Sequence, residues 1–280
     1  MSTRPESWPA PAKLNLFLHV VGRRADGYHL LQTVFRFLDY GDRLHIAVRD
    51  DAAIRMLNPL PGIPEERDLC WRAARLLQTS TGCALGADIR LDKRLPLGGG
   101  LGGGSSDAAT VLLVLNRLWG LGLDRGTLQA LGLQLGADVP VFIFGRSAFA
   151  EGVGEVLRPV SPSPASYVVL KPPVEVPTAR IFADPGLTRD TPMSTIAALR
   201  DGYGHNDLQP VAVALYPQIG DCLAWLRQFG DARMTGSGAC VFAAFPDRAS
   251  AEAVFRRRPA HMDGFVADGL DRHPLFDMVQ

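Results

Sequence analysis

Alternation of apolar and polar residues predicts that the chain begins with β-strands. Because successive side chains of a strand point to opposite faces, the alternation over residues 12–20 predicts a strand that carries Lys13 and Asn15 side by side. Apolar runs over residues 28–38 and 44–49 predict two more strands, with Tyr28 and His29 at the start of the first. The residues that alternate in the opening strand are Ala12, Leu14, Leu16, Leu18 and Val20 on one face and Lys13, Asn15, Phe17 and His19 on the other.

From residue 68 to residue 160 the pattern predicts both helices and further strands. Apolar residues three and four positions apart predict a helix over about residues 68–78, with Asp68 as its N-cap, and another over residues 124–135. Residues 87–91 alternate as a short strand, and residues 147–160 form a pair of hairpin-like runs. Residues 106–116 are apolar on nearly every side, so we expect a helix there that is buried.

A group of prolines and serines around Pro162 interrupts this pattern and predicts a domain boundary. We therefore divide the chain into residues 1–160 and 161–280. In the second part we expect a short helix that starts at Pro177 and bears Phe182, and a long helical region interrupted or kinked by Pro217. The remaining predictions are a strand at 166–171, a looser segment at 186–204, the helical region at 206–229, a strand–turn–strand at 233–242, a helix at 249–257 and a strand at 265–267.

The amino-acid composition limits the class of protein and its possible partners. The chain has 280 residues, 47% of them hydrophobic and 21% charged, which is typical of a globular protein with two modest domains that share a cleft. Its 29 basic and 29 acidic residues give a net charge of zero, so we expect neither a nucleic-acid nor a membrane partner. An anionic ligand would have to be bound locally.

Cysteine and histidine spacing predicts neither a disulfide framework nor a metal centre. The four cysteines lack the Cys-x-x-Cys spacing, and the six histidines are dispersed, so we expect no metal ligated by the protein alone. Residues 1–11 lack the apolar core of a signal peptide, and no run approaches the roughly twenty apolar residues of a membrane span. These features predict a cytoplasmic protein.

The densest chemical signal is a glycine-rich segment before the buried helix. Six glycines lie within the seven residues 98–104. Glycine reaches positive φ and lets the backbone approach a ligand without a Cβ clash. The segment leads into a helix N-terminus, where free N–H groups and the helix dipole favour anions, and either Ser105 or Ser106 can cap that helix. The segment is therefore predicted to bind phosphate.

Two familiar phosphate-binding loops fit this segment poorly. A Walker loop requires Gly-Lys-Ser or Gly-Lys-Thr after the glycines, and no lysine stands there. Gly98, Gly100 and Gly103 satisfy the dinucleotide pattern GxGxxG. However, that pattern should follow a buried parallel strand, whereas the preceding strand alternates with charged residues. A flexible turn would explain neither the glycine density nor the two serines.

A second candidate for chemistry is Asp138, which lies among apolar residues directly before Val-Pro. A buried carboxylate is unfavourable unless it is paired. We therefore expect Asp138 to be a functional residue with a cationic partner.

Together these segments resemble the GHMP kinases, the small-molecule kinases named for galactose, homoserine, mevalonate and phosphomevalonate. Residues 96–109 resemble their ATP-binding motif, and the doubled glycine triplet with Ser-Ser-Asp resembles members that phosphorylate a cytidine diphosphate sugar alcohol. One departure is Ala239 in the third glycine motif, where a serine is frequent, so a hydroxyl contact there is in doubt. The other matching segments are residues 11–18, 27–29, 135–140, 206–208 and 235–240.

The resemblance implies an α+β fold of two domains with the active site in the cleft between them. The N-terminal domain would be like ribosomal protein S5, and the C-terminal domain would be a ferredoxin-like α/β-sandwich. The implied reaction is transfer of the γ-phosphoryl group of ATP, with Mg²⁺ accompanying the nucleotide, to the 2-hydroxyl of the sugar alcohol in non-mevalonate isoprenoid synthesis. The oligomeric state is left open.

The resemblance also implies roles for individual residues. Asp138 would accept the proton of the attacking hydroxyl and contact the substrate, and Lys13 would support Asp138 and the transferring phosphoryl group. Asn15, Tyr28, His29 and Phe182 would bind the cytidyl substrate, and the weaker candidates are Asn206 and Asp207. The ATP loop would comprise Pro96, Leu97, Gly98, Gly99, Gly100, Leu101, Gly102, Gly103, Gly104, Ser105 and Ser106.

Plainer roles compete with these assignments. Lys13 would be a solvated charge on an edge strand, Asp138 a helix or turn cap, Asp107 a charge at a helix start, and Phe182 an ordinary packing residue. At the level of function, the alternatives are a GHMP kinase acting on another small alcohol and a GHMP-fold protein that binds a ligand without phosphoryl transfer.

Overall fold

The chain forms one ten-stranded sheet that is covered by helices. The computed structural model describes residues 7–196 and 204–279. The sheet has the order β3-β4-β2-β10-β7-β9-β8, with β1 paired to β2 and the β5–β6 hairpin attached through β5 to β2. Its strands are β1 (Ser7–Arg23), β2 (His29–Arg49), β3 (Ile54–Met56), β4 (Gly86–Asp92), β5 (Ala148–Glu151), β6 (Val156–Pro159), β7 (Ser166–Lys171), β8 (Ala232–Met234), β9 (Val241–Phe245) and β10 (Asp263–Leu270).

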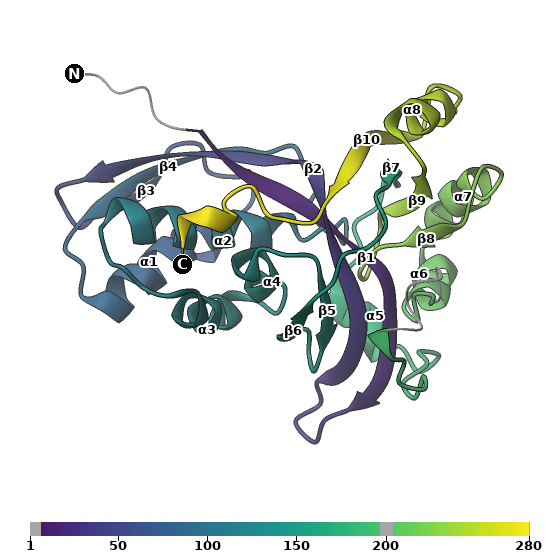
Figure 1. The fold of residues 1–280 in the computed structure, drawn as a ribbon, viewed down its shortest axis with the longest axis horizontal. Coiled ribbons are helices and arrows are strands. Elements are labelled where there is room, and N and C mark those ends of the chain that lie inside the picture. Colours follow the sequence, from purple (N-terminus) through teal and green to yellow (C-terminus); the bar gives the residue numbers. More distant parts are fainter. Residues whose placement is uncertain (1–6, 197–203, 280) are drawn as a thin grey trace.

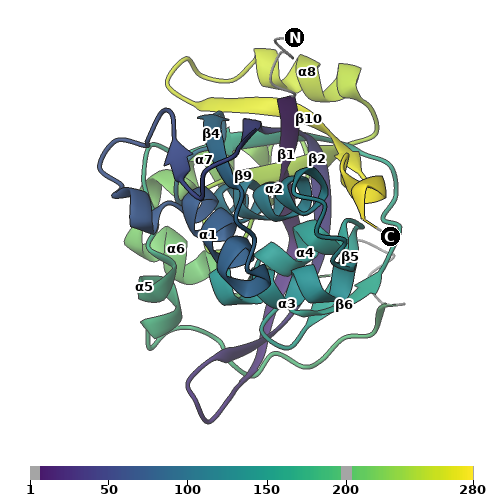
Figure 2. The same cartoon turned by 90° about the vertical axis from the view of Figure 1, so that its left-hand side faces the viewer.

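The helices lie in two groups that follow the chain order. In Figure 2 the first group, α1–α4, lies together in front of the strands. In Figure 1 the helices α6–α8 of the second group lie on the other side of the β1–β2 pair, and α5 overlaps the pair in that view. The α-helices are α1 (Leu69–Thr81), α2 (Gly103–Leu118), α3 (Arg125–Leu135), α4 (Val139–Phe144), α5 (Thr178–Ala183), α6 (Gln209–Leu215), α7 (Pro217–Leu226) and α8 (Arg248–Arg256), and short 3₁₀ turns occur at η1 (Glu65–Arg67) and η3 (Phe276–Met278).

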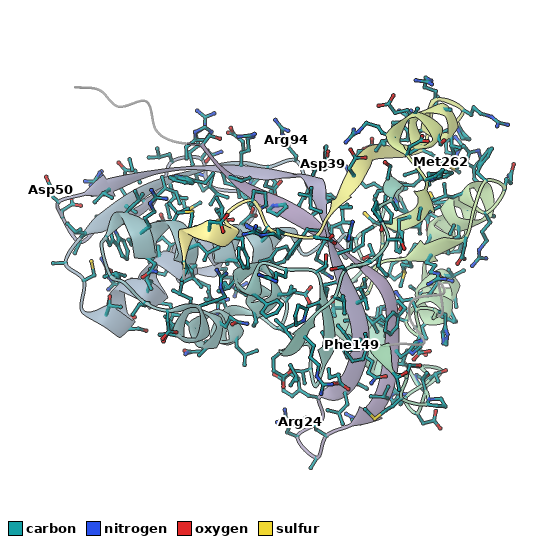
Figure 3. All side chains as sticks on the ribbon, viewed as in Figure 1. Arg24, Asp39, Asp50, Arg94, Phe149 and Met262 are labelled. Carbon is teal, nitrogen blue, oxygen red and sulfur yellow. The ribbon has the colours of Figure 1, made fainter. Side chains whose placement is uncertain are left out.

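The antiparallel β1–β2 hairpin is the longest feature of the fold and crosses the whole molecule (Figure 1). In Figure 3, Arg24 marks its turn and Asp50 marks the far end of β2. Two separate strands over residues 28–38 and 44–49 were predicted, and this was wrong, because β2 is continuous. Gly41 allows it to continue: a Cβ there would come within 2.2 Å of the Ala10 carbonyl oxygen, so only glycine lets β1 pass this closely.

The alternation predicted for β1 holds only for its first part. Lys13 and Asn15 share a face as predicted, but the register with β2 shifts between Asn15 and Leu18. A register shift of this kind changes the face of the sheet to which the following side chains point. Leu18 consequently lines the same cleft as Lys13 and Asn15, whereas strict alternation placed it on the opposite face.

The buried helix predicted over residues 106–116 is confirmed as the central part of α2, whose residues from Ser106 to Asn116 are all buried. It packs against α1, α3, α4 and the β1–β2 pair. The N-caps Asp68 of α1 and Asp124 of α3 each accept backbone N–H groups of the first turn. The capping prediction for Ser105 or Ser106 was wrong, because α2 begins earlier: Gly102, at a φ of 71°, is its N-cap.

The interruption predicted at Pro217 is confirmed: the region 206–229 is two helices, α6 and α7, because Pro217 starts a new helix at its first position. Other differences concern short elements. Helix α4 and strand β3 were not predicted, since six and three residues are too few to show a period. The helix that bears Phe182 begins at Thr178, with Pro177 as its N-cap residue.

Two large clusters of buried apolar residues stabilise the fold. One lies between α1–α4 and the sheet, and the other lies beneath α5–α8. A third, smaller cluster joins residues from both sides of residue 160. The two large clusters fall on either side of the predicted boundary there, with four exceptions. Leu18 and Val20 of β1 belong to the second cluster, and Leu275 and Val279 of the C-terminal segment belong to the first. Within the described ranges, no helix has the length and apolar character needed to cross a membrane.

Candidate active site

Lys13 and Asp138 form an ion pair in the wall of a cleft. Their side chains come from the middle of β1 and from the residue before α4, and Lys13 Nζ lies 3.1 Å from Asp138 Oδ2. The Lys13 side chain is only 3% exposed, which excludes the alternative of a solvated edge-strand charge. Asp138 occupies the N-cap position of α4, yet its side chain makes no capping hydrogen bond, so the cap alternative fails as well. Its carboxylate is 36% exposed to the cleft, so the expectation that Asp138 is buried was wrong.

The other N–H groups of the Lys13 side chain also donate hydrogen bonds. Nζ donates to Asn15 Oδ1 at 2.5 Å and to the Gly100 carbonyl at 3.2 Å. With Asp138, these acceptors match the three N–H groups of an ammonium ion. The charge of Lys13 is therefore held in one place, between the carboxylate and the glycine segment.

Asn15 is buried and positions Lys13. Its Nδ2 donates to Thr33 Oγ1 at 2.9 Å, and the Thr33 hydroxyl in turn donates to the Phe17 carbonyl. The amide has a second N–H, and this is the group through which Asn15 would contact a substrate hydroxyl. That substrate role stays a prediction, because the contacts that the structure shows are to protein groups.

The glycine segment of residues 96–106 wraps around the N-terminus of α2. Gly98, Gly100 and Gly102 adopt φ values of 63°, 73° and 71°, a region that other residues rarely enter. The first turn of α2 leaves its N–H groups without intrahelical acceptors, and Ser105 lies in that turn on the cleft wall. These groups and the helix dipole form an anion site of the kind that binds phosphate.

The second glycine turn, residues 235–240, holds the glycine segment in shape. The N–H groups of Ala239 and Cys240 donate to the carbonyls of Gly98 and Gly99, both at 3.1 Å. Ala239 thus contacts the glycine segment through its backbone N–H, which needs no hydroxyl on its side chain. Thr235 adds a further link: its buried hydroxyl accepts from Asn15 N–H at 2.9 Å and donates to the Gly100 carbonyl at 3.3 Å.

The two serines of the segment have different surroundings. Ser105 lines the cleft, whereas Ser106 is fully buried and is not part of the cleft wall. Asp107 is likewise buried, and it pairs with Lys93 at 2.7 Å. The interpretation of Asp107 as a helix-start charge was wrong, because Asp107 lies beyond the first turn of α2 and is buried in this pair.

Lys93, Asp42 and Asp107 form a buried group of titratable side chains beside the glycine segment. Lys93 Nζ also pairs with Asp42 at 2.6 Å, and Asp42 accepts the backbone N–H groups of Arg94 and Leu95. Burial raises the pKa of the Asp107 carboxyl to about 8, with the Asp42 carboxylate adding to the rise and Lys93 opposing it. Burial alone would lower the pKa of Lys93, but the two carboxylates raise it.

Tyr28, His29 and Phe182 lie at the other end of the cleft. Tyr28 is 64% exposed at the turn of the β1–β2 hairpin, which makes its ring available to a ligand. The rings of His29 and Phe182 pack with centroids 4.9 Å apart and planes at 31°. Phe182 therefore contacts a neighbour in the cleft wall in addition to its own helix.

One cleft of about 1040 Å³ unites the predicted site residues. Ligand pockets commonly measure about 300–1,000 Å³, so this volume suits two ligands bound end to end. Ser106 lies outside the lining, as do Asn206 and Asp207. Asn206 donates to the carbonyls of Met234 and Gly236, and Asp207 accepts from Val20 N–H. The lining includes Lys13, Asn15, Tyr28, His29, the segment from Pro96 to Ser105, Asp138 and Phe182.

Sequence reasoning missed three residues that hold this site together. They are Thr235, Lys93 and Arg189, which contacts His29 at 3.2 Å. Thr235 lies in a motif that was noticed for its glycines. Arg189 lies in the segment predicted to be loose, where no periodicity marks a side chain as buried or exposed.

Comparison with known proteins agrees with this geometry. The GHMP kinases N terminal domain family matches residues 68–146, and the GHMP kinases C terminal family matches residues 192–264. A protein of Thiobacillus denitrificans named 4-diphosphocytidyl-2-C-methyl-D-erythritol kinase is 63% identical over 274 residues, which cover 98% of this chain and 99% of that protein. A protein of the same name from Ralstonia nicotianae is 60% identical, covering 95% of this chain and 94% of that protein.

Solved structures of kinases also match this chain. The crystal structure of 4-(cytidine 5'-diphospho)-2C-methyl-D-erythritol kinase matches with a TM-score of 0.79 and 35% identity, covering 94% of this chain and 99% of that one. Homoserine kinase from Cytophaga hutchinsonii matches with a TM-score of 0.71 at 16% identity, covering 98% of this chain and 97% of that one, and so shares the fold alone. The predicted α+β GHMP kinase fold is confirmed. By sequence and by structure, the chain belongs to the GHMP kinases and, within them, to the 4-diphosphocytidyl-2-C-methyl-D-erythritol kinase family.

Proposed function

We propose that this small-molecule kinase transfers the γ-phosphoryl group of ATP to the 2-hydroxyl of 4-diphosphocytidyl-2-C-methyl-D-erythritol, giving the 2-phosphate and ADP. The step belongs to non-mevalonate isoprenoid synthesis, and we place the enzyme in the cytoplasm. The observation that carries the proposal is that the Lys13–Asp138 pair, the phosphate-binding segment and the aromatic residues Tyr28 and Phe182 all line one cleft.

Asp138 receives the proton of the attacking hydroxyl. Its carboxylate faces the cleft and pairs with Lys13, so it orients the hydroxyl and accepts its proton as the phosphoryl group transfers. Lys13 stabilises the negative charge of the transferring group from a fixed position. Phosphoryl transfer needs little covalent work from the protein, so positioning and charge account for most of the catalysis.

ATP binds with its phosphates on the glycine segment. The N–H groups at the start of α2 and the positive end of its dipole face that position. Magnesium fits this end of the cleft, because the Ser105 hydroxyl lines it and is an oxygen donor beside the phosphate position. Ser105 would hold the ion together with phosphate oxygens, and the bound ion would neutralise part of the phosphate charge.

The aromatic end of the cleft binds the cytosine. Tyr28 presents an exposed ring for stacking, Phe182 supports the opposite wall, and His29 offers a ring nitrogen to the base. The Lys13–Asp138 pair lies between the cytosine and the ATP phosphates in this arrangement, as an in-line transfer requires.

An ADP-release assay tests the proposal. The purified protein is given ATP, Mg²⁺ and, in turn, the cytidyl substrate, mevalonate, homoserine or galactose, and the product is identified by ³¹P NMR. We expect turnover with the cytidyl substrate alone. Turnover with another alcohol would favour a different GHMP kinase activity, and binding of the cytidyl substrate without ADP release would favour a non-catalytic protein.

A further inference from the structure

Arg189 contacts His29 from behind the wall of the substrate pocket. Its Nε donates to His29 Nε2 at 3.2 Å. Three of its four other N–H groups donate to backbone carbonyls: Nη1 donates to Leu187 at 2.9 Å, and Nη2 donates to Phe182 at 3.0 Å and to Asp184 at 2.7 Å. The guanidinium group is therefore fixed in orientation by the same segment that carries Phe182.

This contact determines which nitrogen of His29 carries the proton. A guanidinium group has donors and no acceptor, and it stays protonated in proteins. Nε2 of His29 must therefore present its lone pair to Arg189, and the proton of the neutral ring resides on Nδ1. Burial lowers the pKa of His29, and the positive charges of Arg189 and Arg23 lower it further, so the ring is neutral near pH 7.

The fixed tautomer has a consequence for base recognition. His29 lines the cleft and its Nε2 is occupied by Arg189, so Nδ1–H is the group that the ring offers to a ligand. Cytosine presents acceptors at N3 and O2, whereas uracil carries a proton on N3. A nitrogen that only donates can bond to N3 of cytosine but opposes N3–H of uracil, and a site built for one hydrogen-bonding edge rejects the other strongly.

We propose that Arg189 is a positioning residue that fixes His29 as a donor through Nδ1 and so makes the pocket selective for cytosine over uracil. This inference rests on the proposed function, because it assumes a cytidyl substrate. Arg189 is expected to contact no substrate atom itself.

The tautomer is tested directly on the wild-type protein. Long-range ¹H–¹⁵N correlation spectra of protein labelled with ¹⁵N-histidine distinguish the two neutral tautomers, and the spectrum of His29→Gln assigns the His29 signals. We expect the Nδ1–H form for wild type, and a shift toward Nε2–H with a raised pKa of His29 in Arg189→Met. The Nε2–H form in wild type would overturn the inference, with or without activity data.

Kinetics test the selectivity. We expect Arg189→Met to raise KM for the cytidyl substrate about tenfold with kcat within about twofold, and to reduce the preference over the uridyl analogue by a similar factor. Arg180→Met is the matched control, because Arg180 is an exposed arginine on the neighbouring helix α5, and it should leave both values unchanged. Arg189→Lys keeps the charge but lacks the planar fork, and it should show an intermediate loss of preference.

The outcomes separate the two proposals. If wild type phosphorylates neither pyrimidine substrate, the proposed function fails, while the spectra still decide the tautomer. If wild type is active but the folded Arg189 variants keep both the Nδ1–H form and the full preference for cytosine, the inference about Arg189 is wrong. If Arg189→Met does not fold, the wild-type tautomer and the preference of Arg189→Lys decide.

Discussion

Replacing Asp107 by asparagine should change how the stability of the enzyme depends on pH. In the folded protein the pKa of Asp107 is about 8, against 3.8 for the exposed group. The folded state therefore holds this proton more tightly, and between these two values it binds more protons than the unfolded state does. The contribution of Asp107 to the free energy of unfolding is therefore fully present below pH 3.8, and it is lost as the pH rises toward 8.

The size of the effect follows from the two pKa values. Over most of this window the loss is about 1.4 kcal/mol per pH unit, which amounts to about 2 kcal/mol between pH 6 and pH 8. Asparagine resembles the protonated acid, and its carbonyl can still accept from Lys93. We therefore expect the stability difference between Asp107→Asn and wild type to grow in favour of the variant by about 2 kcal/mol from pH 6 to pH 8.

Urea unfolding between pH 5.5 and 9, followed by tryptophan fluorescence, measures this difference. Asp50→Asn is the matched control, because it makes the same substitution at an exposed position, directly after the end of β2 (Figure 3). For the control, the difference from wild type should not vary with pH. A constant difference for Asp107→Asn as well, or a difference that shifts in favour of wild type as the pH rises, would refute the reasoning.

Three further predictions concern the cleft. Asp138→Asn should lower kcat by at least about 10²-fold, the usual range for a proton acceptor, and leave both substrate affinities nearly unchanged in calorimetry; wild-type turnover would remove Asp138 from this role. Tyr28→Ala should raise KM for the cytidyl substrate and spare KM for ATP in steady-state assays, and a collapse of ATP affinity would mean that the two pockets are reversed. Thr235→Val should lose about 1–3 kcal/mol in urea unfolding because the buried Asn15 N–H loses its acceptor, whereas Thr235→Ser should retain wild-type stability.

The parts of the fold that sequence predicted are those with a local cause. Helix α2 shows an apolar surface all round, and Asp68 and Asp124 stand at helix starts where a short acidic side chain satisfies free N–H groups. The continuity of β2 was not predictable in this way. Gly41 normally signals a turn, and only the approach of Ala10 on the neighbouring strand shows why glycine stands within a strand there.

The same distinction between local and distant causes applies to the candidate site. The glycine segment was predictable as an anion site because its glycines and its helix are contiguous in sequence. The pairing of Lys13 with Asp138 joins residues distant in the chain, and without the family resemblance nothing in the sequence linked them. No sequence pattern marked Arg189. Its role depends on His29, which is distant in the chain, and on backbone carbonyls of an irregular segment.

The continuous sheet limits how the cleft can close around its ligands. β10 pairs with β7 and then, through Gly269 and Leu270, with β2, while Leu18 of β1 packs into the cluster beneath α5–α8. Proteins that close by hinge bending concentrate the motion in a few linking residues. Rotation of the two halves here would break strand pairs and expose buried side chains. We therefore expect a rigid frame, in which catalysis relies on a preformed distance between the two substrates and binding adjusts loops and side chains only.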